Sequence, residues 1–187
     1  MGSSWSSSSG TSKSEALGWT GKVYFDPESD KKNSKIIPIN DSELKTRLKE
    51  CIDPKEEIRN IWIYKEQLTP GPQSTTLLEE VLLFHAFIVL ETNSWYWSIE
   101  KNNEGITIQR SKELYYVNRW YRDRERKGVP QEWEHDTGRM KMGDFVDWLY
   151  HEDELNKPYH VTNANCQHFG KAVFNHFAKT KIKNFNF

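Results

Sequence analysis

The chain has 187 residues, a formal net charge of −1, two cysteines, and eight Trp, eight Tyr and nine Phe. This length is enough for one domain with a hydrophobic core, and the aromatic content excludes a disordered chain. The balanced charge predicts no nucleic-acid partner, and no apolar run reaches the ~20 residues that a membrane-spanning helix needs. Because a secreted domain of this size usually carries more cysteines, we expect a reducing, cytoplasmic compartment.

The N-terminal residues 1–20 are polar and rich in serine, which predicts a flexible leader. The leader begins Met1-Gly2-Ser3-Ser4-Trp5-Ser6, and this run fits the N-myristoylation pattern with Gly2 as the lipidated residue. The alternative is a serine-rich tail or a remnant of an expression tag. One myristoyl chain binds membranes only marginally, so the lipidation hypothesis predicts a peripheral membrane association.

The first part of the folded chain is predicted to hold two strands and one helix. Strands are expected at 23–25 and at 58–64, where β-branched and aromatic residues gather. Asp41 or Ser42 is expected to cap a helix through Cys51, because apolar side chains recur there on one helical face. Cys51 lies beside that face, so we interpret it as a small core residue.

The central part of the chain predicts an antiparallel meander. Residues 75–92 favour a long strand, the turn at 93–94 reverses the chain, and 95–101 form the partner strand. A second turn at 102–105 leads into a third strand at 106–109. Three strands joined by such short connections pair with their sequence neighbours.

The last third of the chain is predicted to be helical. A helix is expected from Ser111, and the mixed charges of 122–127 favour its solvated end. Residues 131–138 are interpreted as a loop, and Asp144 as the cap of a second helix. The final helix is expected over 165–179.

Cys166 stands at the start of this final helix, where Asn163 or Asn165 is a suitable N-cap. A thiol in the first helical turn lies near unpaired N–H groups and the positive end of the helix dipole. Both stabilise the thiolate, which is the reactive form of cysteine. We expect the sulfur of Cys166 to be presented at the helix tip and to act as a nucleophile.

His85, in the first strand of the meander, is the candidate base for this thiol. If residues 93–94 form a two-residue turn, Val89 lies opposite Ser98, and Glu100 lies diagonal to His85 on the same face. A carboxylate there holds the imidazole in the tautomer that accepts a proton. Ser98 is the weaker candidate for this orienting role. The alternative is that His85 is a core histidine without chemistry.

Two motifs carry a resemblance to a known family. Asn165-Cys166-Gln167-His168-Phe169 resembles the Asn-Cys-Glu-His-Phe box of the lecithin:retinol acyltransferase-like proteins, and the run His85-Ala86-Phe87-Ile88-Val89 is similar to their histidine strand. These proteins are circularly permuted relatives of the NlpC-type, papain-like thiol hydrolases, with histidine before cysteine. The PPPDE isopeptidases share a similar box and strand. The resemblance covers about 75–177.

The resemblance implies a nucleophile at Cys166, a general base at His85, and an α+β fold with a small antiparallel sheet packed with helices around a permuted papain-like core. It also implies a thiol domain over 71–187, with 21–70 as its N-terminal extension. The relatives use a second histidine where this chain has Trp97. We assign Trp97, together with Asn165 of the cysteine box, to substrate binding.

Three functions remain open at this stage. The first is a thiol enzyme acting on acyl groups, a phospholipid acyl hydrolase or acyltransferase with an acyl-enzyme on Cys166. The second is an isopeptidase or other amide hydrolase, because the same dyad cleaves esters and amides. The third is a non-catalytic binding module. The partner is then an acyl lipid or a conjugated protein. No cofactor is expected, and no metal site, since the cluster His151-Glu152-Asp153 lacks a second ligand pair.

Overall fold

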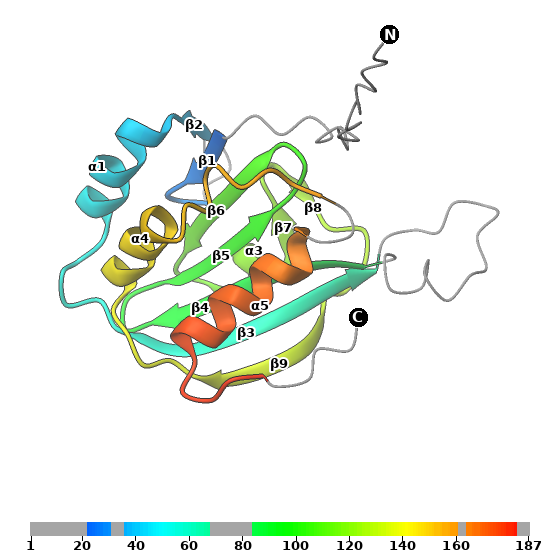
Figure 1. The fold of residues 1–187 in the computed structure, drawn as a ribbon. Helices are drawn as coiled ribbons and strands as arrows, with labels where there is room; N and C mark the ends of the chain where they lie inside the picture. Colours follow the sequence, from blue (N-terminus) through cyan, green and yellow to red (C-terminus); the bar gives the residue numbers. More distant parts are fainter. Residues whose placement is uncertain (1–21, 31–35, 68–83, 161–163, 183–187) are drawn as a thin grey trace, which may run out of the picture.

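The computed structural model describes residues 22–30, 36–67, 84–160 and 164–182 (Figure 1). Within these residues the fold is α+β, with a mostly antiparallel seven-stranded sheet of order β2-β1-β6-β5-β4-β3-β9, a small β7-β8 hairpin and four helices. The strands are β1 (Lys22–Asp26), β2 (Ile37–Ile39), β3 (Ile58–Gln67), β4 (Phe84–Thr92), β5 (Tyr96–Lys101), β6 (Gly105–Ser111), β7 (Trp120–Tyr121), β8 (Arg124–Glu125) and β9 (Gln131–Thr137). The helices are α1 (Asp41–Cys51), α3 (Leu114–Arg119), α4 (Met142–His151) and α5 (Cys166–Phe177).

The predicted meander is present as β4, β5 and β6, and its register agrees with a two-residue turn. Val89 pairs with Ser98 and Glu91 with Tyr96, as a turn at 93–94 requires. Thr92 closes this turn, since its N–H donates to the Trp95 carbonyl at 2.8 Å. Residues 75–83 of the expected long strand lie outside the described residues, as do Gly2 and the leader 1–20.

The range 21–70 contributes β1, β2 and β3 to the same sheet. β1 pairs in parallel with β6 at one side, and β3 lies between β4 and β9 at the other. The strands expected at 23–25 and 58–64 are therefore confirmed. The three strands lie on both sides of the meander rather than in a separate layer (Figure 1).

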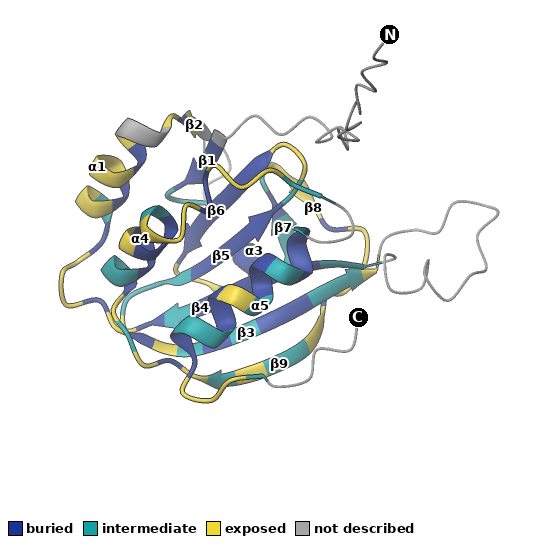
Figure 2. Cartoon of the chain, viewed as in Figure 1, coloured by how far each residue is buried: buried dark blue, intermediate teal, exposed yellow. Residues whose placement is uncertain are grey.

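The two faces of the sheet are covered differently. Helices α1, α4 and α5 pack on one face, where they share a large apolar core with Ile63, Ile88 and Ile99 of the sheet (Figure 2). Helix α3 covers the other face, where Val117 packs with a smaller cluster of Tyr64, Phe87 and Val89. We call the first the apolar face and the second the polar face, because the second also buries Ser98, Glu100, Thr107 and Gln109.

Two expectations for the last third of the chain are wrong. Residues 122–127 are not a solvated helix end: α3 stops at Arg119, and the chain folds into the β7-β8 hairpin, which is followed by the buried Arg126. Residues 131–138 are not a loop, because β9 pairs with β3 along the edge of the sheet. β9 is an edge strand, so its side chains are mostly polar and are exposed or half-buried. The sequence therefore lacks the alternation of apolar and polar residues from which a strand is predicted.

Two helix caps also differ from expectation. Asn40 caps α1, and its side chain accepts the Glu43 N–H at 3.1 Å. In α4 the N-cap residue is Lys141, and Asp144 lies inside the first turn, where its carboxylate accepts the Lys141 N–H at 2.9 Å. Both carboxylate and amide still satisfy N–H groups at the helix start. No helix among the described residues is both long and apolar enough to cross a membrane.

Candidate active site

Cys166 is the first residue of α5, and Asn165 is its N-cap. The Asn165 side chain accepts the N–H groups of Gln167 at 3.0 Å and His168 at 3.1 Å, which places the helix start as predicted. The sulfur, however, is not presented to solvent, since Cys166 is only 4% exposed. Helix α5 lies along the sheet, and Cys166 belongs to the side of the helix that faces it, so the expectation of an exposed tip is wrong.

The sulfur of Cys166 reaches the sheet where β4 and β5 stop pairing. The described pairing of these strands ends at Ile88 with Ile99, and beyond it the Ala86 N–H donates to Sγ at 3.5 Å. The Tyr159 hydroxyl lies 3.8 Å from the same sulfur and donates to it. Two donors therefore face Sγ, and both favour its anionic form.

His85 lies between the thiol and a carboxylate. Its Nε2 is 2.7 Å from Oε2 of Glu100, and its ring is close enough to Cys166 for the two groups to shift each other's pKa. The diagonal relation between His85 and Glu100 follows from the register of β4 and β5. This geometry brings together three of the predicted residues, on β4, β5 and α5.

The electrostatics favour an ion pair between thiolate and imidazolium. Burial opposes the charge on His85, but the attraction of Cys166 and the hydrogen bonds to Cys166 and Glu100 raise its pKa to about 10. Burial likewise opposes the Cys166 thiolate, but His85 together with the Ala86 and Tyr159 donors lowers the pKa of the thiol. For both groups the attraction of the partner and the hydrogen bonds together exceed the desolvation cost, which favours the thiolate and the imidazolium.

Glu100 is itself held by a buried arginine. Arg126 Nη2 lies 2.6 Å from Glu100 Oε1, and Arg126 Nη1 lies 2.7 Å from Glu66 Oε2. Burial raises the pKa of Glu100, but Arg126 and then His85 lower it below its usual value. Glu100 therefore stays a carboxylate although its side chain is 1% exposed.

The structure places two of the predicted residues, Ser98 and Trp97, away from the contacts of His85 and Cys166. The Oγ of Ser98 is buried and has no hydrogen-bond partner among the described residues, so Ser98 does not orient His85. Trp97 is fully buried on the apolar face, where its indole N–H donates to Glu56 at 2.8 Å and its ring stacks on Phe25. A side chain in that position packs the core and offers no surface to a substrate.

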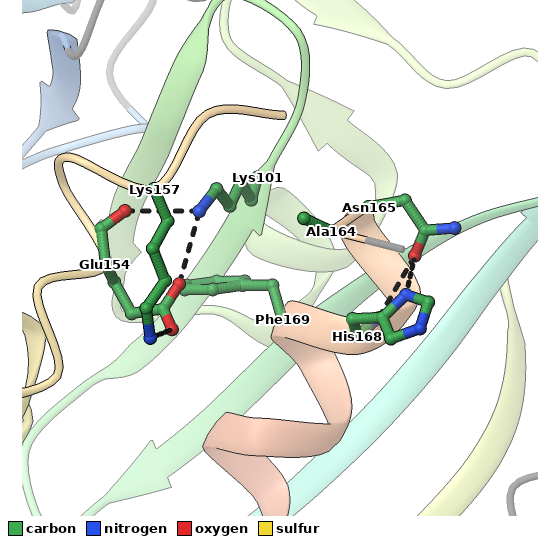
Figure 3. A pocket seen from close by; sticks show the side chains of 7 residues that line it. All are labelled: Lys101, Glu154, Lys157, Ala164, Asn165, His168 and Phe169. Carbon is green, nitrogen blue, oxygen red and sulfur yellow. Dashed lines mark hydrogen bonds and ion pairs between the residues drawn. The ribbon is translucent and has the colours of Figure 1, made fainter. Parts of the chain in front are cut away.

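A pocket of about 190 Å³ lies beside the start of α5 (Figure 3). Lys101, Glu154 and Lys157 form one side, and the other side and floor are Ala164, Asn165, His168 and Phe169. Lys101 Nζ contacts the Glu154 carboxylate at 3.2 Å and the Glu154 carbonyl at 3.1 Å. Asn165, predicted to bind substrate, thus lines this pocket and also caps the helix whose first residue is Cys166.

Sequence reasoning missed Tyr159, Glu66 and Arg126. Tyr159 precedes Cys166 by seven residues in a segment without regular periodicity, so no pattern assigns its direction. Glu66 is the cross-strand partner of His85, which the sequence shows only once β3 is aligned with β4. The sequence around Arg126 did not predict that it is buried at the site, because the mixed charges there are typical of a solvated surface.

Comparison with known proteins adds no further constraint on the site. No protein-family model, no curated protein and no solved structure matches the chain.

Proposed function

We propose that the protein is a Cys/His thiol enzyme that acts on acyl groups through an acyl-enzyme on Cys166. The observation that carries the proposal is the buried arrangement in which His85 lies 2.7 Å from the Glu100 carboxylate and interacts electrostatically with Cys166. A nucleophile, a base and a third group that orients the base are the arrangement that covalent acyl transfer requires.

In the first half of the reaction the Cys166 thiolate attacks the carbonyl carbon of an ester or amide. A C–S bond forms, and the carbonyl oxygen becomes an oxyanion. When the intermediate collapses, the bond from carbon to the leaving oxygen or nitrogen breaks. The leaving group takes a proton from the imidazolium of His85, and a thioester remains on the sulfur. Because Nε2 faces Glu100, Nδ1 is the nitrogen that gives this proton to the leaving group.

In the second half an acceptor removes the acyl group. His85 takes a proton from water or from an amine, the acceptor attacks the thioester carbonyl, and the C–S bond breaks. Water releases a carboxylic acid, whereas an amine gives an amide. The thiolate and the imidazolium are then restored together.

Tyr159 fits the role of a donor at this centre. Burial and the nearby Cys166 charge raise the pKa of its phenol, so the hydroxyl stays protonated and able to donate. Its contact with Sγ stabilises the resting thiolate. In the tetrahedral intermediate the same hydroxyl is within reach of the developing negative charge.

The substrate class has two candidates. Phospholipid acyl chains are the first, in keeping with the resemblance of the cysteine box. The second is an amide substrate with polar groups, which the charged side chains of Lys101, Glu154 and Lys157 at one side of the pocket can contact. An isopeptidase-like activity on conjugated proteins is therefore the second candidate function.

The arrangement also supports a permuted papain-like core. The strand with the histidine precedes the helix with the cysteine in the chain, and the helix start packs on that strand. The third polar position is Glu100, in place of the second histidine of the acyltransferase-like proteins. We propose that this carboxylate does the work of that histidine.

Labelling with an activity-based thiol probe tests the proposal. Rapid labelling is expected for the wild type and for Cys51→Ala, since Cys51 lies apart from His85. Labelling is expected to disappear in Cys166→Ala and to slow by a factor of about 10² or more in His85→Ala. Intact-mass spectrometry after reaction with an activated ester is expected to show one acyl group, lost with Cys166.

One result decides against the proposal, and one comparison then assigns the substrate class. Labelling no faster than that of a free cysteine, and indifferent to His85→Ala, indicates a binding module without thiol chemistry. For an active thiol, phospholipid esters and ubiquitin-like conjugates offered side by side distinguish the two substrate classes by their kcat/KM.

We further propose that the protein is cytoplasmic and that myristoylation of Gly2 brings it to membranes. The support is the sequence of the first six residues. Mass spectrometry of the N-terminus from the native source is expected to show a myristoyl group on Gly2. An unmodified N-terminus in all the material excludes the lipid anchor and leaves the thiol chemistry untouched.

A further inference from the structure

Two carboxylates flank His85 on the polar face. Glu100 of β5 contacts Nε2 directly, and Glu66 of β3 is the cross-strand partner of His85. An imidazole between two carboxylates has two alternative partners. Turning toward Glu66 would move the ring away from Glu100 and change its angle to Cys166, so the site needs a group that decides between them.

Arg126 contacts both of these carboxylates. Its Nη2 lies 2.6 Å from Glu100 and its Nη1 lies 2.7 Å from Glu66, so a single guanidinium bridges β3 and β5 across β4. The guanidinium also stacks on the ring of Phe87, 3.9 Å from its centroid. Phe87 is two residues after His85 on the same face of β4.

The backbone around Arg126 holds it in this position. Its N–H donates to the Arg119 carbonyl at 2.8 Å, and its Nε donates to the Asn118 carbonyl at 3.1 Å. The side chain is 2% exposed, and all of its nitrogens have partners. A buried arginine with this many fixed contacts is a rigid part of the site.

We propose that Arg126 is a positioning residue of the active site, which bridges Glu100 and Glu66 so that Glu100 is reserved for His85 and Glu66 is kept from competing. The inference rests on the proposed function, because it concerns how the Cys166–His85 dyad is oriented. Arg126 does not reach the sulfur itself. It acts through Glu100.

The charge of Arg126 has a second effect through the same contacts. A carboxylate as buried as Glu100 tends to take up a proton, and the guanidinium opposes this. An ionised Glu100 stabilises the His85 imidazolium, and the imidazolium stabilises the thiolate. The other titratable and charged groups that face this cluster are Glu66 on β3, Cys166 at the start of α5, Tyr121 on β7 and Tyr159 in the segment before α5.

Lysine cannot replace arginine here without loss. The two bridging contacts and the stacking on Phe87 use the planar fork of the guanidinium, whereas an ammonium is a compact charge that reaches one carboxylate well. Arg126→Lys therefore keeps the positive charge and removes the bridge. Arg126→Gln removes both.

The pH dependence of Cys166 alkylation by iodoacetamide tests the proposal. The full chain carries Cys51→Ala, so that Cys166 is the remaining thiol. In Arg126→Gln the midpoint of alkylation is expected to rise, with a rate below the midpoint about tenfold lower. Arg126→Lys is expected to lie between this variant and the parent, and Glu66→Gln within about threefold of the parent, because Arg126 still holds Glu100.

Arg122→Gln is the matched control. Arg122 lies in the hairpin that precedes Arg126 and is also an arginine that pairs with a glutamate, but its ion pair is with Glu104 at 2.7 Å. Its alkylation midpoint is expected to equal that of the parent. Circular dichroism at each pH identifies variants that are folded. If Arg126→Gln does not fold, the alkylation midpoint of Arg126→Lys tests the proposal, and a midpoint equal to that of the parent overturns it.

Failure of the inference is distinguishable from failure of the proposed function. If the parent already alkylates with the midpoint of a free cysteine, the dyad is not activated and both fail. If the parent has a low midpoint that folded Arg126 variants share, the thiol is activated without Arg126 and the inference alone is overturned. An equal rise in Arg122→Gln also overturns it, since the effect then belongs to the hairpin as a whole.

Discussion

The same strands build both faces of the sheet, yet the two faces are organised in opposite ways. On the apolar face Leu48 of α1, Phe145 of α4 and Val173 of α5 meet the isoleucines of the strands in one continuous core. On the polar face four buried residues form a small apolar cluster, and charged groups lie beside it. The apolar face holds the fold together, and the polar face holds His85 against Glu100.

The difference shows how a buried charge is kept in a small domain. The charged groups of the candidate site neutralise one another in turn, from Cys166 at the start of α5 through His85 and Glu100 to Arg126 and Glu66. Signs alternate along this chain, so no ion is left unpaired. The apolar face needs no such alternating arrangement of its side chains, because dispersion and hydrophobic burial are not directional.

Glu100→Gln is expected to give the largest effect on the polar face. The amide keeps the size of the side chain but removes the charge that stabilises the His85 imidazolium. Turnover of an acyl substrate is expected to fall by a factor of about 10²–10⁴. Steady-state kinetics measure it, with Glu104→Gln as the control, since Glu104 pairs with Arg122 at the surface. An unchanged kcat would show that His85 needs no carboxylate partner.

Leu48→Ala tests the apolar face by itself. Leu48 is fully buried on α1, and the cavity is expected to lower the free energy of unfolding by about 2–5 kcal/mol. Denaturant unfolding measures this loss, and exposed Glu50→Ala on the same helix is expected to change it by less than ~0.5 kcal/mol. The alkylation midpoint of Cys166 is expected to stay constant. A shift of that midpoint would show that the two faces are coupled.

The pH profile separates the two members of the dyad. Turnover needs the Cys166 thiolate, whose pKa is lowered, and the His85 imidazolium, whose pKa is raised to about 10. Turnover is therefore expected to rise at a pH below the ordinary thiol range and to fall, about tenfold per pH unit, as the pH passes about 10. Alkylation needs only the thiolate and is expected to stay fast above that point. A parallel fall in both rates contradicts the assignment of His85 as the acid.

Gly170→Ala is expected to have the smallest effect. A Cβ on this helical residue would lie 3.9 Å from Ile88 and 4.0 Å from Ile63, which is ordinary contact. The helix then gains about 0.5–1 kcal/mol in stability from the lost flexibility of glycine. Thermal unfolding measures the gain. Gly138→Ala is the contrast, because its Cβ would lie 2.4 Å from the Ile58 carbonyl oxygen, and it is expected to destabilise the protein.

Much of the candidate site was predictable because it depends on local rules. The turn at 93–94 sets the register of β4 and β5, and this register alone puts Glu100 diagonal to His85. Asn165 as a cap sets the start of α5 and so the position of Cys166. A turn and a cap each involve only a few neighbouring residues, and their geometry varies little between proteins.

The sequence by itself determined the meander and the helix that begins near Cys166, and it made Glu100 one of two candidate partners for His85. Only the tertiary structure decided that Cys166 and Trp97 are buried, that 131–137 form an edge strand, and that Arg126 joins the site. Arg126 is 26 residues from Glu100 and 60 residues from Glu66 in the chain. A charged residue is buried only where distant partners offset its loss of water, and the sequence around it carries no record of those partners.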